Sequence, residues 1–575
     1  MLVNGGRLFA KQLKKEGVEQ IFTICGGQIM PVIYGCRAEG IKVVDVRHEN
    51  AGVYAADAYA RATGKPGVIL PTVTPGVMQT MQGVFEARAA GSPILVISAS
   101  VSVDEFDSGA EQDMGMDTYN ILKSNTVWAA KIFETHRIPE YVAKAFRQMT
   151  GPAPGPVYLE VPVNIMKTQV EMDDIAFPSQ TRCKAQSYGD PALIEQAAEL
   201  IANAKQPAFV VGDAAIFSSE GGREAFEELV DYLKIPVYAT TMSRGLFGDE
   251  DNPLFRIGEG CLSDADVIVT LAAAMNFRLN LGQPPMINDK AKFVQIHPDI
   301  RMIGFNCAAD VGIVASTGAA ARQLLEAVKA KAPKRTDNTW VKKAEALHAA
   351  YRADWDEAYT SEDITPMHPA RLAAEVGKFL NEEAKDWSIA ADGGDAYEWI
   401  MRATRMHYPG QIVGYNANGT IGTGQGFAMG QWYAHGKPVL EYTGDGSVGF
   451  YLGEFDTMAR HGIPVICVIS NDVQWGMVKM AETMRSTNEI TNGYVATTLA
   501  ERRYEKIAEV FDGYGEYVED INEVIPAIKR AAATGKPSII NVRVDSEHPC
   551  PFTIMYGCGG RPLTKEEIAA YYAQK

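Results

Sequence analysis

Short runs of β-branched and other apolar residues alternate along the chain with longer stretches of helical pattern. The first such runs lie at 20–25, 42–46, 67–73 and 93–99. Strands separated by helices form parallel sheets, because a parallel pair needs a crossover connection and a helix supplies it. The alternation therefore predicts an α/β fold with parallel sheets.

The alternation divides the 575 residues into three successive units. Polar stretches at 168–189 and 332–338 separate these units, and a charged helical stretch at 339–358 follows the second one. We predict three doubly wound parallel-sheet domains and a C-terminal tail, at 1–168, 190–331, 366–545 and 546–575.

The charge composition limits the kinds of molecule that the protein can bind. Asp and Glu total 71 against 54 Lys and Arg, so the formal net charge is −17. A surface this acidic repels nucleic acid and anionic lipid, although a bound cation can still create a local site for a small anion. No apolar run is long enough to span a bilayer, and the 8 cysteines contain no C-x-x-C pair. We expect a cytoplasmic protein with small-molecule ligands and without nucleic-acid or membrane partners.

The strongest chemical signal is the run Gly444-Asp445-Gly446-Ser447, which follows one apolar strand, with Asn471-Asp472 at the end of the next strand. Glycines at such a turn let backbone N–H groups approach a phosphate, and carboxylate oxygens suit Mg²⁺. Ligands bind at the carboxyl ends of strands in doubly wound sheets. A Gly-Asp-Gly alone is more often an ordinary turn, but the second strand with Asn-Asp favours a phosphate and metal site.

A second signal is Arg47-His48-Glu49, directly after an apolar strand and at the start of an alanine-rich helix. A carboxylate buried there would have a raised pKa and could share a proton with a ring nitrogen. The alternative is an ordinary glutamate that interacts favourably with the helix dipole.

Together these motifs resemble the thiamine-diphosphate-dependent enzymes of the acetolactate synthase, benzaldehyde lyase and 2-hydroxyacyl-CoA lyase group. The resemblance extends over nearly the whole chain. It implies pyrimidine-binding, central and diphosphate-binding domains, with thiamine diphosphate and Mg²⁺ as cofactors. It also implies a homodimer or homotetramer whose active sites lie at the subunit interface. Separately, the C-terminal tail is rich in Gly, Cys and aromatic residues at 548–562, and we expect it to form a flap over the active site.

The resemblance also implies roles for individual residues. Glu49 is the expected catalytic residue, which bonds N1′ of the aminopyrimidine. The expected metal ligands are Asp445, Asp472 and Gln474, the last through its backbone carbonyl. Asp472 replaces the usual Asn and adds a negative charge beside the diphosphate. The expected cofactor-binding residues are Gly393, Gly394, Asp395, Gly419, Ile421, Gly444, Asp445, Gly446, Ser447 and Asp472.

Substrate and nucleotide binding are less constrained by the resemblance. The expected substrate pocket contains Gly27, Gln28, Gln112, Trp475 and Met477. Benzaldehyde lyase has a histidine where Gln28 stands, and an amide cannot shuttle protons as histidine does, which argues against that activity. Relatives that bind FAD or ADP carry an arginine where this chain has Ala272–Ala274, so we expect a structural central domain without FAD.

The expected activity is that of a carbon–carbon lyase or carboligase acting on 2-hydroxy ketones or 2-hydroxyacyl-CoA thioesters. The first alternative is an acetolactate-synthase-like carboligase that decarboxylates 2-keto acids. A remote alternative is a non-catalytic thiamine-diphosphate-binding regulator, which would require the loss of Glu49 or of the metal loop. The sequence alone does not name the substrate or the direction of the reaction.

Overall fold

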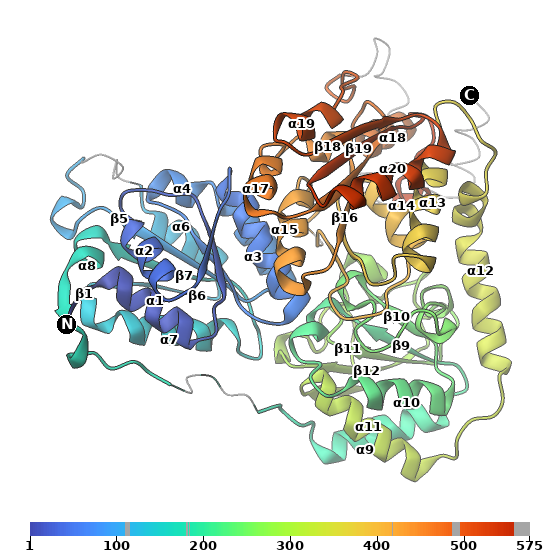
Figure 1. Cartoon of the computed structure of the whole chain (residues 1–575). Coiled ribbons are helices and arrows are strands. Elements are labelled where there is room, and N and C mark those ends of the chain that lie inside the picture. The colour runs from blue at the N-terminus through green and yellow to red at the C-terminus, as the bar shows by residue number, and fades with distance from the viewer. Residues whose placement is uncertain (110–115, 180–181, 183–184, 417, 486–494, 557–575) are drawn as a thin grey trace.

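A computed structural model of the chain describes residues 1–109, 116–179, 182, 185–416, 418–485 and 495–556. Within these residues the strands form three parallel sheets and one short antiparallel pair. Figure 1 shows the first unit in blue on one side and the third unit, in orange and red, above the green central unit. The predicted fold class, three doubly wound parallel-sheet units, is confirmed.

The first sheet has the strand order β3-β2-β4-β5-β7-β6. Its strands are β2 Gln20–Thr23, β3 Lys42–Asp45, β4 Gly67–Leu70, β5 Ile94–Ser100, β6 Trp128–Lys131 and β7 Val157–Pro162. The helices of this unit are α1 Gly5–Lys15, α2 Met30–Ala38, α3 Glu49–Thr63, α4 Thr74–Met78, α5 Met81–Ala90, α6 Thr118–Asn125, α7 Ile138–Met149 and α8 Val163–Lys167. The predicted linker at 168–189 begins differently, because β8 Gln169–Glu171 pairs antiparallel with β1 Leu2–Asn4.

The central sheet has the order β10-β9-β11-β12-β13. Its strands are β9 Pro207–Val211, β10 Val237–Ala239, β11 Val267–Leu271, β12 Lys292–His297 and β13 Val311–Val314. The helices are α9 Pro191–Asn203, α10 Arg223–Leu233 and α11 Thr317–Lys331. The long helix α12 Thr339–Tyr359 then runs along the outside of the molecule toward the third unit.

The third sheet has the order β15-β14-β16-β17-β19-β18. Its strands are β14 Ser388–Ala391, β15 Ile412–Gly414, β16 Val439–Gly444, β17 Val465–Asn471, β18 Tyr514–Val518 and β19 Ser538–Arg543. The helices are α13 Pro369–Glu382, α14 Asp395–Ala403, α15 Gly424–His435, α16 Asp445–Val448, α17 Glu454–His461, α18 Gly476–Arg485, α19 Glu505–Val510, α20 Ile521–Thr534 and α21 Pro551–Tyr556. None of the helices in the described ranges is long and apolar enough to cross a membrane.

Helix α3 of the first unit packs directly against α15 of the third. The two backbones approach closely at Gly430, where a Cβ atom would lie 2.3 Å from the carbonyl oxygen of Ala55. Only a residue without a side chain fits at that distance. The first and third units therefore form one continuous core, which includes Phe22 and Val44 from the first sheet and Val439 and Val465 from the third.

A fully buried charge network crosses the same junction. The Arg61 guanidinium pairs with Asp57 and, at 3.1 Å, with Glu86, and none of the three side chains is exposed. Arg61 also donates to the Gly414 carbonyl at 2.9 Å, and Glu86 accepts the Asn416 N–H at 2.6 Å. Two carboxylates on one arginine thus connect α3 and α5 to the end of β15.

We expect Arg61→Ala to lower the free energy of unfolding by about 3–5 kcal/mol, because it leaves two carboxylates buried without their cation. Urea unfolding followed by circular dichroism measures the change. The control is Arg137→Ala, since Arg137 pairs with Glu140 where both side chains are 41% exposed and such surface pairs contribute at most about 1 kcal/mol. Equal effects of the two substitutions would contradict a structural role for the buried network.

Candidate active site

A cavity of about 230 Å³ lies at the carboxyl ends of β14, β16 and β17. The structure brings together here most of the third-unit residues predicted from the sequence. They are Gly394, Asp395, Gly419, Ile421, Gly444, Asp445, Gly446, Ser447, Asp472, Gln474, Trp475 and Met477. Gly393 is not in the lining but borders it, since a Cβ there would lie 3.4 Å from the Ser447 hydroxyl oxygen. The beginning of the predicted flap also contributes, through Ser546 and His548.

Two buried carboxylates dominate the electrostatics of this cavity. Both carboxylate oxygens of Asp445 are buried without a hydrogen-bond partner among the described residues. Burial raises the pKa of Asp445 to about 6. Burial and the neighbouring charge of Asp445 raise the pKa of Asp472 well above its usual range. Two such groups side by side are costly as anions unless a cation lies between them, so this donor set fits a divalent metal ion such as Mg²⁺.

The backbone between the candidate metal ligands is strained. Val473 has a φ of 63°, a left-handed conformation that a β-branched residue rarely adopts, at a cost of about 1–2 kcal/mol. Two hydrogen bonds to the segment at 497–499 hold it, from Leu499 N–H to the Val473 carbonyl and from Trp475 N–H to the Thr497 carbonyl. The strained turn places Asp472 and Gln474 at the same cavity, as expected from the sequence, whereas the strain at Val473 was not expected.

The Trp475 ring packs directly against the backbone of the Gly444–Ser447 turn, at Gly446. A Cβ atom at Gly446 would lie 2.7 Å from the Trp475 indole, so any other residue there would collide with the ring. The Gln474 side-chain amide donates to Asp472 at 3.1 Å and to the Ser546 carbonyl at 2.7 Å. Lys479 donates to the Gln474 side-chain oxygen at 2.6 Å. These three hydrogen bonds fix the Gln474 side chain beside Asp472.

Glu49 lies elsewhere, at the N-terminal end of α3 in the first unit. Its exposure is only 9%, and burial raises its pKa. The loop before it is held by Glu454 of the third unit, whose carboxylate accepts the backbone N–H groups of Arg47 and His48 at 3.0 and 2.9 Å. Glu454 was missed by the sequence analysis, because its partners are about four hundred positions away.

Gln28 lies in the same region of the first unit as Glu49. The Thr72 hydroxyl donates to the Gln28 side-chain oxygen at 3.5 Å, and a Cβ atom at Gly76 would lie 3.1 Å from Glu49 Oε1. Neither Glu49, Gln28 nor Gly27 is among the residues that line the 230 Å³ cavity of the same chain. Gln112 lies outside the described residues.

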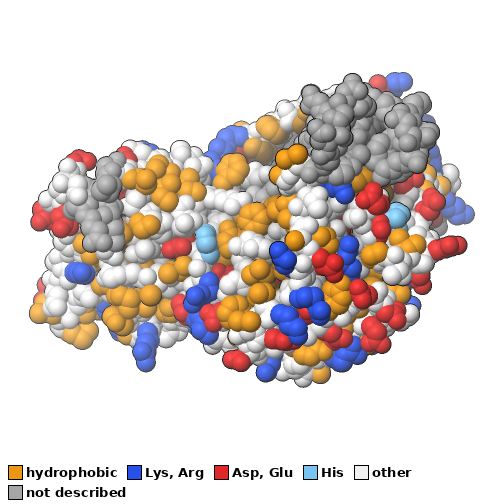
Figure 2. Space-filling model, turned by 90° about the horizontal axis from the view of Figure 1, so that it is seen from above, with side chains coloured by type: hydrophobic (Ala, Val, Ile, Leu, Met, Phe, Trp, Pro, Cys, Tyr) orange, Lys and Arg blue, Asp and Glu red, His pale blue; other side chains and the backbone are white. Residues whose placement is uncertain are grey.

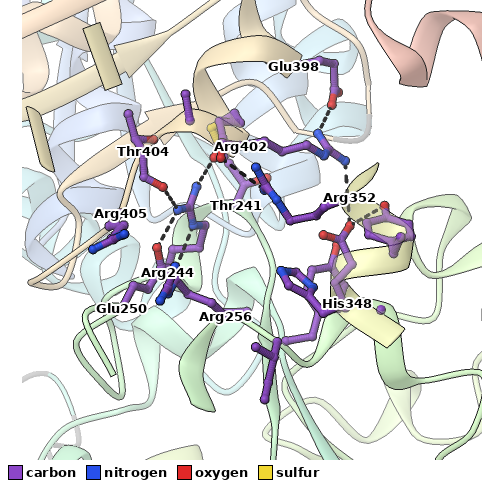
Figure 3. Close-up of a pocket in the computed structure, with 18 of the residues that line it drawn as sticks. Thr241, Arg244, Glu250, Arg256, His348, Arg352, Glu398, Arg402, Thr404 and Arg405 are labelled. Carbon is purple, nitrogen blue, oxygen red and sulfur yellow. Dashed lines mark hydrogen bonds and ion pairs between the residues drawn. The ribbon is translucent and has the colours of Figure 1, made fainter. Parts of the chain in front are cut away.

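A larger cavity of about 1290 Å³ separates the central unit from α12, α13 and α14. Figure 3 shows the arginines around it, with Arg244 bonded to Glu250 and Arg402 to Glu398. Arg256 and Arg278 also line it, and neither forms an ion pair with a described carboxylate. The Nε atoms of both are buried without a hydrogen-bond partner in the described part of the chain. Because no ion pair with a described carboxylate offsets them, these two guanidinium groups leave positive charge along the cavity, which suits an anionic ligand.

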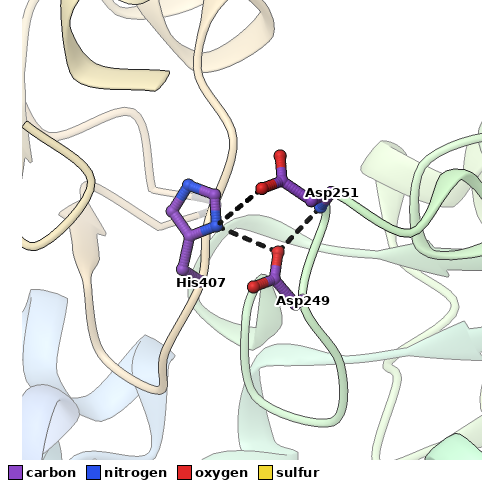
Figure 4. A group of neighbouring side chains, drawn as sticks. All are labelled: Asp249, Asp251 and His407. Atoms are coloured by element: carbon purple, nitrogen blue, oxygen red, sulfur yellow. Dashed lines mark hydrogen bonds and ion pairs between the residues drawn. The ribbon is translucent and has the colours of Figure 1, made fainter. Parts of the chain in front are cut away.

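A third cluster joins the central and third units. His407 Nδ1 lies 2.9 Å from Asp249 and 4.0 Å from Asp251 (Figure 4). Asp251 already pairs with Lys385 at 2.7 Å and with Arg405 at 3.2 Å. Because these two cations neutralise its charge, the cluster is an ion-pair junction between units rather than a metal site.

Comparison with known proteins covers all three units. Family models described as thiamine pyrophosphate enzyme match at 3–121 (N-terminal TPP binding domain), 194–324 (central domain) and 392–542 (C-terminal TPP binding domain). The chain is 29% identical to 2-hydroxyacyl-CoA lyase 2 of Caenorhabditis elegans, over 90% of this chain and 85% of that protein. It is 26% identical to a probable acetolactate synthase of Mycobacterium bovis, over 94% and 96%. It is also 26% identical to 2-hydroxyacyl-CoA lyase 1 of Homo sapiens, over 95% of both chains.

Replacing Glu454 by Gln tests the contact that holds the loop before Glu49. Burial raises the pKa of Glu454 to about 7, against about 4.3 in an unfolded chain. The folded state therefore holds more protons between these values, and this group makes the free energy of unfolding fall as the pH rises through them. We therefore compare the free energies of unfolding of the parent and of Glu454→Gln at two pH values. The parent's value minus the variant's should be larger near about pH 5 than near about pH 7.5. Urea unfolding at both pH values measures it, and a constant difference would contradict the prediction.

Proposed function

Because the chain belongs to the thiamine pyrophosphate enzyme family, we propose that it is a thiamine-diphosphate-dependent carbon–carbon lyase of 2-hydroxyacyl-CoA thioesters, able to run in reverse as a carboligase. The observation that carries the proposal is the arginine-lined cavity beside the smaller one. CoA carries several phosphate charges, and Arg256 and Arg278 offer guanidinium groups that no described carboxylate pairs.

Helix α14 borders both cavities. Its residues Asp395 and Trp399 line the smaller cavity, whereas Glu398 and Arg402 line the larger one. A thioester could therefore place its nucleotide end among the arginines and pass its acyl end around α14 to the cofactor.

This arrangement also explains how a protein of net charge −17 can bind a polyanionic substrate, since the positive charge is local. Figure 2 shows acidic and basic side chains interleaved over the lobe that the central and third units form.

In the proposed site, Asp445, Asp472 and the Gln474 carbonyl would hold Mg²⁺, whose charge would offset that of the cofactor's diphosphate. Bound thiamine diphosphate would supply a nucleophilic carbon and an electron sink for cleavage of a carbon–carbon bond next to a carbonyl. The turns at Gly393–Asp395 and Gly444–Ser447 place backbone N–H groups near the phosphate position. Ile421 supports the cofactor from the apolar side of the cavity.

Glu49 is the proposed proton-transfer group. Burial favours its neutral form, so it can share a proton with a ring nitrogen of the cofactor near neutral pH. Since the lining of the smaller cavity contains no residue before Pro369, we propose that a second copy of the chain supplies Glu49 and Gln28. This requires at least a homodimer. We also propose that the central domain is structural and binds no FAD.

A second candidate is an acetolactate-synthase-like carboligase acting on 2-keto acids. It is supported by similarity to a probable acetolactate synthase over 94% of this chain. That reaction needs no polyanion site, so the two candidates differ in the role of the large cavity. Turnover of pyruvate with CO₂ release, without cleavage of any acyl-CoA, would favour the second candidate.

Glu49→Gln should lower turnover of a 2-hydroxyacyl-CoA by at least about 100-fold, because an amide cannot transfer the proton. Affinity for thiamine diphosphate, measured by calorimetry in Mg²⁺, should change much less. Glu140→Gln, at an exposed site on α7, is the control. Turnover by Glu49→Gln at the parent rate would overturn the catalytic assignment.

Arg256→Gln should raise KM for a 2-hydroxyacyl-CoA by about tenfold or more, because it removes a charge-assisted bond to phosphate. The same variant should cleave a 2-hydroxy ketone that lacks CoA as the parent does. Arg405→Gln is the matched control, since Arg405 lines the same cavity but already pairs with Asp251. Unchanged KM for the thioester in Arg256→Gln would contradict CoA binding in this cavity.

A further inference from the structure

Asp392 is a fully buried carboxylate at the end of β14 that connects two separate segments of the third unit. Its Oδ1 accepts the N–H groups of Gly393 at 2.6 Å and Gly422 at 3.2 Å. Its Oδ2 accepts the N–H of Gly424 at 2.9 Å. Both oxygens are therefore used, and two of the three donors come from a segment about thirty residues further along the chain.

Each connected segment contributes to the smaller cavity. Gly394 follows Gly393 directly, and Gly419 and Ile421 precede the two distant donors. Gly419 and Gly422 have left-handed φ values of 63° and 81°. Glycines lose much conformational freedom on folding, so a turn of this kind needs an outside group to hold one conformation. Asp392 supplies that group from the adjacent strand.

The neighbouring buried acid, Glu441 on β16, provides a natural comparison. It is also fully buried, and a Cβ atom at Gly424 would lie 2.3 Å from its Oε1. The carboxyl oxygens of Glu441, unlike those of Asp392, have no hydrogen-bond partner among the described residues. Burial and the charge of Asp392 raise the pKa of Glu441 well above its usual range, which favours the neutral form of Glu441. Of these two neighbouring buried acids, therefore, Asp392 is the one whose oxygens accept backbone N–H groups.

We propose that Asp392 is a positioning residue that holds the segment Gly419–Gly424 against Gly393 and Gly394. By fixing Gly422 and Gly424, it sets where Ile421 and the Gly419 carbonyl lie in the cavity. This inference rests on the proposed use of that cavity for thiamine diphosphate. It concerns a residue that touches neither the metal ligands nor the substrate pocket in the assignments above.

The test compares Asp392→Asn with Glu441→Gln. Each replaces a fully buried carboxyl by its isosteric amide, but only the first removes an acceptor that faces backbone N–H groups. In Asp392→Asn we expect the Kd for thiamine diphosphate in Mg²⁺, measured by calorimetry, to rise about tenfold or more. Hydrogen–deuterium exchange of the peptide covering 419–424 in the cofactor-free protein should also accelerate. In Glu441→Gln both quantities should stay within about twofold of the parent.

Three results would overturn the inference. They are an unchanged Kd in Asp392→Asn, a raised Kd without faster exchange of the 419–424 peptide, and an equal effect of Glu441→Gln. If Asp392→Asn does not fold, Asp392→Ser takes its place, because a serine oxygen can reach the Gly393 N–H but not the two distant donors; the same outcomes then apply. Failure of the parent itself to bind thiamine diphosphate would instead refute the proposed function, so the two failures are distinguishable.

Discussion

Asp445 and Asp472 lie side by side at the carboxyl ends of two adjacent parallel strands, buried and with little to neutralise them. Buried like charges are among the most expensive arrangements in a protein, and here burial raises the pKa of both groups. A divalent cation would remove this cost, and it would supply the local positive charge that a diphosphate requires. The strained Val473 turn, the glycine beside Trp475 and the segment that Asp392 holds all serve to keep this one site in shape.

The three units are joined by charged groups as well as by apolar packing. Arg61 connects the first and third units from a fully buried position. Arg244 connects the central unit to the third, through the carbonyls of Met401 and Thr404. Arginine suits such junctions because its planar group donates several hydrogen bonds at once. The large cavity lies at one of these junctions, so the same residue type that joins the units also places positive charge on the wall of the cavity.

Much of the fold and site was predictable from local patterns, while the missed features share a physical cause. The antiparallel pair of β1 and β8 was not predicted, and β8 lies where a linker was expected. Each of these strands has only three residues, which is too short for a recognisable pattern, and its partner lies at the other end of the first unit. Similarly, Glu454 and Asp392 look like ordinary acids in the sequence. Their roles come from backbone donors that only folding brings close.

The amino-acid sequence by itself determined the α/β class, the three-unit organisation and the residues of the turns that line the smaller cavity. These features depend on residues within one strand, helix or turn, where side-chain pattern and backbone preference act directly. The tertiary structure decided which of these residues lie close together and which are buried or left without an ion-pair partner. It placed Glu49 apart from the cavity of its own chain, left Arg256 and Arg278 unpaired beside α14, and buried Asp392 against a distant glycine turn. Burial and pairing arise between residues far apart in the chain, and no local pattern encodes them.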